Sequence, residues 1–328
     1  MTHLKMAGAL VAVSAVTLAA AVTITVAKAE EYPAKEIHAI YGYAPGSGGD
    51  IYVRHLAERI QRVAGKPVVV MNRVGASGNI AAEYVAKSKP DGHTILFSSG
   101  NAMASSPYLF KNPPYNAIKD FQLFGTVLNQ PWMMLVDAKK PWKTVADLTA
   151  YLKEKGDKGS YATATPIGTV MGELYKSVAG LETVQVNYRA IADSLNDLLS
   201  GSIDVIMGDP VFGAGQIASG RLRALAVSTS ERTKSFPDVP TLAEAGVAGI
   251  TLNVWWAAAV PAATPKPVVD KLNAWLAYAL KQEDTAALFK RNGADVFIST
   301  PEDAQKRLAR ELKEWGEYVR LAKIQPSG

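Results

Sequence analysis

A glycine-rich turn, A-P-G-S-G-G-D at residues 44–50, follows a short apolar run and precedes a helical pattern. The apolar run covers residues 37–41, and the helical pattern covers residues 51–64 and ends at Gly65. Glycines allow positive φ angles, and a helix that begins just after them presents unpaired N–H groups and the positive end of its dipole. The turn therefore predicts an anion site, and it leaves open whether the anion is a dinucleotide, a phosphate or a carboxylate. The plainer alternative is that the glycines only shape a tight turn.

Strand and helix patterns alternate after this turn. Strand-like segments occupy residues 68–71 and 94–97, and a second glycine turn at 75–78 opens a helical segment at 79–87. Such a βαβαβ order predicts a parallel sheet with ligand chemistry at the carboxyl ends of its strands.

The same alternation returns in the middle of the chain. Helices are predicted at residues 144–155, 169–179 and 193–200, and strands at 160–164, 184–187, 203–207 and 224–227. Apolar stretches at residues 123–136 and 252–260 flank this unit, and each could carry the chain from one domain to the other. Helices at 267–282 and 301–322 are expected to pack on the first sheet.

The chain begins with a pattern that is typical of export. A basic start precedes a charge-free apolar run at residues 6–27, and A-K-A at 27–29 provides a cleavage site after Ala29. The alternative is an uncleaved membrane anchor, because the run approaches the roughly 20 residues that span a bilayer. The chain has no cysteine, which suits a bacterial periplasmic protein that is stabilised by its core alone. We therefore predict a signal peptide at 1–29, one domain from 30–128 with 254–328, and a second domain at 129–253.

Catalytic and cofactor motifs are scarce. The net charge is +5, and removal of Lys5 and Lys28 leaves +3, which is too weak to indicate nucleic-acid binding. His38, His55 and His93 form no metal-binding motif, and neither a G-x-S-x-G elbow nor a Walker sequence occurs. Ile51 stands where the third glycine of a dinucleotide-binding motif should be. We predict no catalytic residue, no metal and no cofactor.

Several longer strings resemble one family of receptors. They are Y-P-A-K at residues 32–35, P-G-S-G-G-D at 45–50, V-V-V-M-N-R-V-G-A-S-G-N at 68–79, K-P-D-G-H-T-I-L at 89–96, P-Y-N-A-I-K-D-F at 114–121, G-R-L-R-A-L-A-V at 220–227, F-P-D-V-P-T-L-A-E-A-G-V at 236–247 and V-P-A-A-T-P near Pro261. Through these strings nearly the whole chain after residue 29 resembles the solute-binding receptors of tripartite tricarboxylate transporters, the Bug-type receptors.

The resemblance implies a fold, a function and a site. The fold is an α/β two-domain periplasmic-binding-protein fold of type II, a Venus flytrap with its ligand cleft between the lobes. The function is capture of a small carboxylate and delivery to a membrane permease, by a receptor that we expect to be a monomer. The backbone positions that the family uses for the carboxylate correspond to Pro45, Gly46, Ser47, Gly48 and Gly49, and in the second domain to Thr163, Thr165, Gly168 and Thr169.

This chain departs from the family pattern at three places. Ser47 and Gly49 exchange the usual glycine and hydroxyl positions, and the turn after Tyr161 is about three residues shorter than usual, with Pro166 inside it. Where the family often has Y-K-G-G-A-P, this chain has Y-R-A-I-A-D at residues 188–193. In the last of these strings Ile191 adds bulk and Asp193 provides a helix cap, which predicts an altered cleft wall there.

Further wall residues are expected from their positions at predicted strand ends and on the predicted crossover. They are Ser98, Ser99, Asn101, Arg189, Ala190, Asp209, Asn253, Trp255 and Trp256. Arg189 could pair with a second carboxylate or lie in solvent. One tryptophan is expected in the core and the other, assigned as Trp255, against the ligand. An aromatic carboxylate and a dicarboxylate both remain open as ligands, and a sensory receptor or a secreted enzyme are the alternative functions.

Overall fold

The computed structural model describes residues 32–326. Residues 33–326 form one compact unit, and the predicted signal peptide lies outside the described residues. No helix within residues 32–326 is long and apolar enough to cross a membrane.

The first sheet is six-stranded, with the order β11-β4-β10-β3-β1-β2. Its strands are β1 (Ile37–Tyr41), β2 (Val68–Asn72), β3 (Thr94–Ser99), β4 (Phe121–Gln130), β10 (Val254–Pro261) and β11 (Asp295–Val296). Strands β1, β2 and β3 are parallel, as predicted, whereas β10 runs antiparallel to both β3 and β4. The carboxyl ends of β1 and β3 therefore open on the same edge of the sheet.

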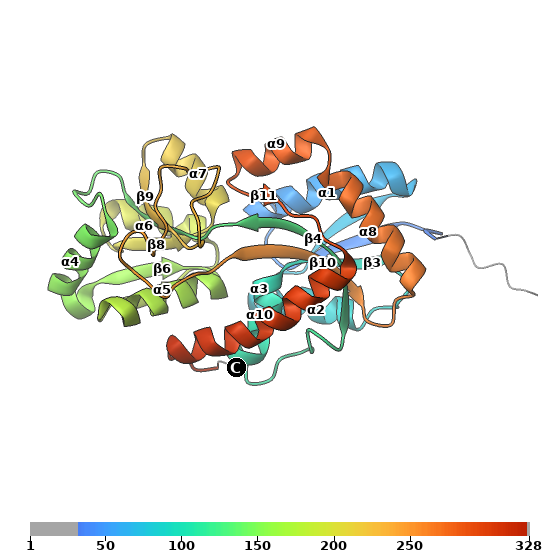
Figure 1. Ribbon diagram of the computed structural model, residues 1–328, viewed down its shortest axis with the longest axis horizontal. Coiled ribbons are helices and arrows are strands. Elements are labelled where there is room, and N and C mark those ends of the chain that lie inside the picture. Colours follow the sequence, from blue (N-terminus) through green and yellow to red (C-terminus); the bar gives the residue numbers. More distant parts are fainter. Residues whose placement is uncertain (1–31, 327–328) are drawn as a thin grey trace, which may run out of the picture. The chain divides into compact units, whose positions relative to one another are not determined.

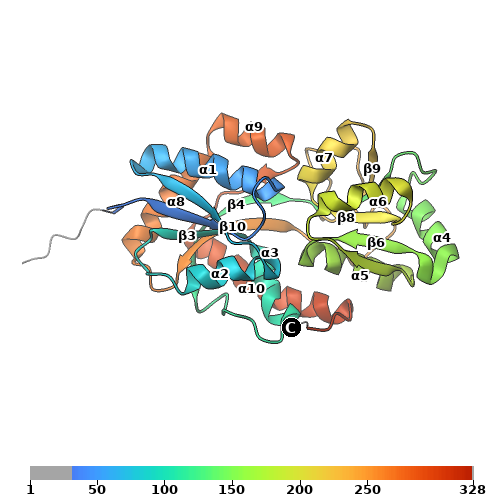
Figure 2. The same cartoon turned by 180° about the vertical axis from the view of Figure 1, so that it is seen from behind.

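Helices cover both faces of this sheet. They are α1 (Gly48–Ala64), α8 (Lys266–Leu280) and α9 (Glu283–Arg291) on one face, and α2 (Asn79–Ala86), α3 (Gly100–Leu109) and α10 (Pro301–Leu321) on the other (Figures 1 and 2). The C-terminal helices α8 and α10 pack on β4, in agreement with the prediction from sequence. We call this sheet and its helices the first lobe.

The second sheet is five-stranded, with the order β7-β6-β8-β5-β9. Its strands are β5 (Met133–Asp137), β6 (Ser160–Thr163), β7 (Val184–Asn187), β8 (Val205–Gly208) and β9 (Leu222–Val227). Its helices are α4 (Val145–Lys155), α5 (Pro166–Ala179), α6 (Leu195–Ser200) and α7 (Pro210–Ala218), with short 3-10 turns at Gly156–Lys158 and Ile191–Ser194. Strands β6, β7 and β8 are parallel, so their carboxyl ends also share one edge. We call this sheet and its helices the second lobe.

Strands β4 and β10 lie side by side where the chain passes between the lobes (Figure 1). Every residue of β10 is buried, and its small Ala257–Ala259 segment pairs with both neighbouring strands. Burial of a strand on both faces requires the continuous apolar pattern that residues 252–260 show in the sequence.

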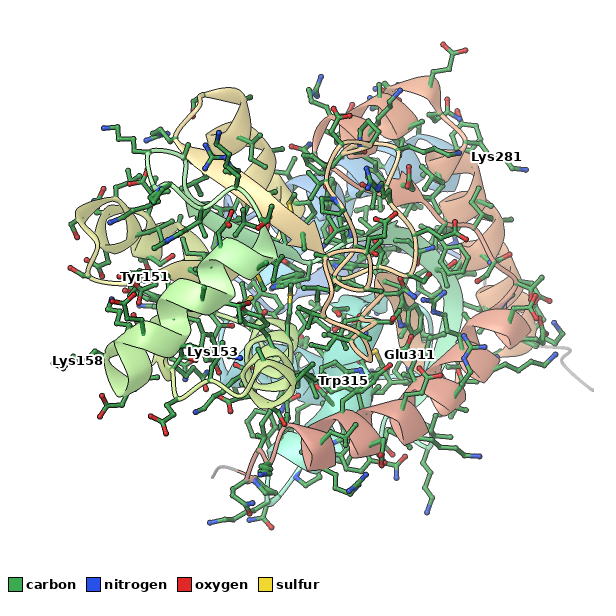
Figure 3. All side chains as sticks on the ribbon, turned by 60° about the vertical axis from the view of Figure 1, so that its left-hand side comes forward. Tyr151, Lys153, Lys158, Lys281, Glu311 and Trp315 are labelled. Atoms are coloured by element: carbon green, nitrogen blue, oxygen red, sulfur yellow. The ribbon has the colours of Figure 1, made fainter. Side chains whose placement is uncertain are left out.

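A buried polar cluster fixes the segment that enters β10. The Asn101 side chain, 4% exposed, donates to the Asn253 carbonyl (3.2 Å) and to Glu311 Oε2 (3.2 Å), and accepts the Trp255 N–H (3.2 Å). Figure 3 shows Glu311 and Trp315 on α10, where α10 packs on α3. The Asn101 side chain of α3 thus hydrogen-bonds both to the segment that enters β10 and to α10.

The carboxyl group of Glu311 is 6% exposed. Burial raises its pKa to about 7, although Arg307, whose Nη2 lies 3.7 Å from Oε1, acts in the opposite direction. A carboxyl group whose pKa is raised by folding contributes stability that is present at low pH and is lost as the pH rises through the folded-state pKa.

We expect this linkage to be measurable with Glu311→Gln. The free energy of unfolding of the wild type, relative to the variant, should fall by about 3 kcal/mol between about pH 4.5 and pH 7 and level off above pH 8. Chemical denaturation across this range measures the difference, and the exposed Glu154→Gln serves as the control. A pH-independent difference would mean that Glu311 does not titrate in this range.

Candidate functional site

Asp50 organises the glycine turn from inside. Its Oδ2 accepts the Gly46 N–H (2.8 Å) and Arg54 Nε (2.8 Å), and its Oδ1 accepts Asn72 Nδ2 (2.8 Å). Burial acts to raise the pKa of this carboxyl group, but these hydrogen bonds outweigh burial and hold the pKa below its ordinary value. Gly46 has a φ of 78°, which an L side chain rarely adopts, so the turn requires glycine there.

Helix α1 begins at this turn with unpaired donors. The Ser47 N–H donates to the Ala44 carbonyl (3.2 Å), and the Ser47 side chain makes no cap hydrogen bond. Among residues 32–326, no acceptor lies within hydrogen-bond geometry of the N–H groups of Gly48, Gly49 and Asp50. These donors and the helix dipole form a place for an anion.

The free donors at this turn differ in part from those that the sequence predicted. Gly46 was expected to offer a donor, but its N–H is engaged by Asp50, and Pro45 has no N–H to offer. The Ser47 Oγ is buried and, within the described part of the chain, has no hydrogen bond of good geometry, although contact with it acts to lower the pKa of Tyr41. The donors that remain are the Ser47 hydroxyl and the N–H groups of Gly48, Gly49 and Asp50.

Aromatic rings back the turn. A Cβ on Gly49 would lie 2.0 Å from the Tyr41 hydroxyl and 2.1 Å from the Trp256 ring. The Tyr41 and Trp256 ring centroids are 5.5 Å apart, and the Tyr52 ring meets Trp256 edge-on at 6.3 Å. The hydroxyl residue that the family often has at the position of Gly49 therefore has no room in this chain.

The tryptophan at the turn is Trp256, and not Trp255 as assigned from sequence. Trp255 is fully buried on the other face of β10, where its ring fills the space beside Gly100 and lies 4.9 Å from the Arg307 guanidinium. Trp256 is 6% exposed. Alternation along the strand predicts that the two rings point to opposite faces, but it does not tell which face carries the turn.

The second lobe meets this turn through α7. Asp209 follows β8 and caps α7 by accepting the Phe212 N–H at its Oδ1 (2.9 Å). A Cβ on Gly48 would lie only 2.7 Å from Val211 Cβ, so the first turn of α7 packs directly on the start of α1. Burial raises the pKa of Asp209, and the charge of Asp209 contributes to the raised pKa values of Tyr41 and Tyr52.

Threonine side chains make several hydrogen bonds within the turn between β6 and α5. Thr165 Oγ1 accepts the Gly168 N–H (3.3 Å), Thr163 Oγ1 donates to the Thr165 carbonyl (3.1 Å), and Thr169 Oγ1 accepts from Gln185 Nε2 (2.9 Å). Gly168 packs so closely on Thr163 and the Met207 carbonyl that a Cβ would not fit. The four predicted residues thus lie together at the carboxyl end of β6.

Other predicted residues lie apart from the turn. Asn101 is committed to the crossover, and Ser99 caps α3 by accepting the Ala102 N–H (3.4 Å). Arg189 and Ala190 are exposed after the edge strand β7. Within residues 32–326 no group of three or more His, Cys, Asp or Glu side chains is placed to hold a metal ion.

Two cavities lie in the first lobe, away from the α1 turn. One of about 720 Å³ is lined by residues at the amino ends of β1 and β3, among them His38 and Thr94, at the opposite end of β1 from the glycine turn. Another, of about 200 Å³, lies beside Asn253 and Glu311. The free N–H donors at the start of α1, and not a cavity, therefore mark the α1 turn as the candidate site.

We predict that Gly49→Ala destabilises the protein by about 1–3 kcal/mol, because the new methyl group would overlap Tyr41 and Trp256 within the core. Gly215→Ala is the matched control, since Gly215 lies in α7 with open space around its Cβ position, and it should stabilise by about 0.5–1 kcal/mol. Denaturant titration compares the two. Equal stability of the two variants would contradict the packing described at the turn.

Most of the chain is similar to known receptors. The model of the family described as "Tripartite tricarboxylate transporter family receptor" matches residues 52–323. Protein BugT of Bordetella pertussis is 31% identical over 315 residues, which cover 95% of this chain and 96% of BugT. An R. palustris protein solved with adipate shares 28% identity at a TM-score of 0.85, covering 90% of this chain and 100% of its own. MatC of Rhodopseudomonas palustris with bound malate shares 26% identity at a TM-score of 0.81, with 88% and 100% covered. This chain belongs to the tripartite tricarboxylate transporter family of receptors.

Proposed function

We propose that this protein is a periplasmic solute-binding receptor that captures a small carboxylate between its lobes and delivers it to the membrane subunits of a tripartite tricarboxylate-type transporter. The observation that carries the proposal is the row of N–H groups at Gly48, Gly49 and Asp50, which have no acceptor among residues 32–326 and lie where α1 packs on Val211 of the second lobe. Similar proteins that were solved with adipate and malate support a carboxylate as the ligand class.

Backbone donors can hold a carboxylate without a cationic side chain. A hydrogen bond to an ionised acceptor contributes about 1.5–3 kcal/mol, so three such bonds contribute at most about 9 kcal/mol before the costs of association are subtracted. Apolar contacts and closure of the lobes must therefore supply part of the affinity. The Ser47 hydroxyl adds a further donor at the same place. In this arrangement Trp256 would form the apolar wall.

The second lobe contributes the opposite side of the proposed site. Residues Thr163–Thr169 and the start of α7 lie at the carboxyl ends of β6 and β8, and Arg189 follows β7 on the same edge. Arg189 is exposed, so it is free to meet a second carboxylate of a longer ligand. A dicarboxylate and an aromatic carboxylate both fit this proposal.

Binding would act through domain closure. The ligand touches both lobes only when α7 approaches α1, so it shifts an existing equilibrium between open and closed forms toward the closed form. We further propose that the lobes correspond to residues 30–128 with 254–328 and to residues 129–253, that the receptor is a monomer, and that residues 1–29 direct export and are removed.

A thermal-shift screen of mono- and dicarboxylates, aliphatic and aromatic, tests the proposal. At least one carboxylate should raise the melting temperature, because a ligand that binds only the folded state stabilises it by mass action. The ligand should be recovered intact by mass spectrometry after incubation. Stabilisation by a nicotinamide, an amine or a sugar without any carboxylate would contradict the proposal, and turnover of the ligand would indicate an enzyme.

Gly48→Ala tests the role of closure with the same ligand. The added methyl group would meet Val211 and oppose the approach of α7, so we expect the affinity to fall about tenfold or more while the stability of the free protein is retained. Combination with Val211→Gly should restore part of the affinity. An unchanged affinity in Gly48→Ala would place the ligand away from this contact.

A further inference from the structure

Asp209 is a carboxylate without a counter-ion. Within residues 32–326 no Lys, Arg or His lies within ion-pair distance of it, and the donors that reach its side chain are backbone N–H groups, with Phe212 at 2.9 Å. Asp50, on the facing side of the same contact, is held by Arg54 and Asn72. The two carboxylates at this place thus differ in how their charge is balanced.

Capping of α7 does not by itself require a charge. Serine and asparagine cap helices about as well as aspartate, and in this chain the uncharged Ser99 and Thr165 side chains cap α3 and α5. The negative charge of Asp209 therefore calls for a role beyond the cap.

The charge of Asp209 lies close to the free donors of α1. Val211, two residues along the chain from Asp209, packs on Gly48. The Tyr41 hydroxyl lies against Gly49, and the Tyr41 pKa, which is raised mainly by burial, is raised further by the charge of Asp209. A carboxylate bound at the α1 donors would therefore lie near a second negative charge in a partly buried place, where repulsion is poorly screened. A hydrogen-bond donor on the ligand would convert this repulsion into an attraction.

We infer that Asp209 makes the receptor selective for carboxylates that carry a hydroxyl or ammonium group on the carbon next to the bound carboxylate. This inference rests on the proposed function, because it assumes that a carboxylate occupies the α1 donors. The shared chemistry of the selected ligands is a hydrogen-bond donor directed at Asp209.

Matched sets of ligands compare a hydroxyl or an ammonium group with hydrogen on the carbon next to the carboxylate. Propionate, lactate and alanine form one set, and succinate, malate and aspartate form another, with hydrogen, hydroxyl and ammonium at the same position. Isothermal titration calorimetry at pH 7.5 should find that the wild type binds a substituted member about tenfold or more tightly than the unsubstituted member of its set.

Asp209→Asn keeps a capping side chain but removes the charge. In this variant the advantage of the ammonium ligand should fall about tenfold or more, and the unsubstituted carboxylate should bind more tightly than it does to the wild type. Asp157→Asn, an exposed charge change on the second lobe, should leave the order of affinities unchanged.

Two outcomes would overturn the inference and leave the proposed function standing. One is tightest binding of the unsubstituted carboxylate by the wild type, and the other is an affinity advantage of the ammonium ligand that Asp209→Asn leaves unchanged. If neither these sets nor any carboxylate of the wider screen binds, the proposed function itself fails.

Discussion

The hydrogen bonds of Asp50 shape the site on which the proposed function depends. By accepting the Gly46 N–H while it holds Arg54 and Asn72, this carboxylate closes the turn and ties it to β2. The charge of Asp50 is balanced within the first lobe, and its own N–H and those of Gly48 and Gly49 have no acceptor in the part of the chain that the structure describes. An acidic residue in the first turn of the helix thus supports an anion site next to it, because its own charge is neutralised by Arg54.

The two lobes contribute differently to this place. The first lobe offers free backbone donors backed by Tyr41 and Trp256. The second lobe offers α7, whose amino end is already capped by Asp209, and α5, whose amino end is capped by Thr165. Under the proposed function the carboxylate therefore binds mainly to the first lobe. The second lobe contacts the rest of the ligand when the lobes close. The Asn101 and Glu311 cluster behind β10 gives the crossover a fixed anchor for such an approach.

Much of the fold could be predicted from the sequence because its signals are local. Alternating apolar runs and amphipathic segments predicted the parallel strands of both sheets and the packing of α8 and α10 on the first sheet. Helix α3 was missed, because its ten residues include Pro107 and three adjacent small or polar residues before it, and they carry no clear apolar face. The short β11 was missed too, because two residues carry no period.

The site was less predictable because its details are not periodic. That Gly46 is engaged by Asp50 depends on a side chain folding back four residues, for which the spacing from Gly46 to Asp50 was the available signal. The identity of the tryptophan at the turn depends on which face of β10 meets α1, and Asn101 was drawn from a strand end into the crossover by partners more than 150 residues away. These are tertiary facts that no local pattern encodes.

The most direct test of the account follows the backbone amides themselves. In a ¹H–¹⁵N NMR titration with a carboxylate that stabilises the protein, the amide protons of Gly48, Gly49 and Asp50 should move downfield most, because they gain a charged acceptor. The Gly168 amide, which already donates to Thr165, should move less. Unchanged amides at the start of α1, with the largest shifts at α5 or at the cavity beside His38, would contradict the central claim.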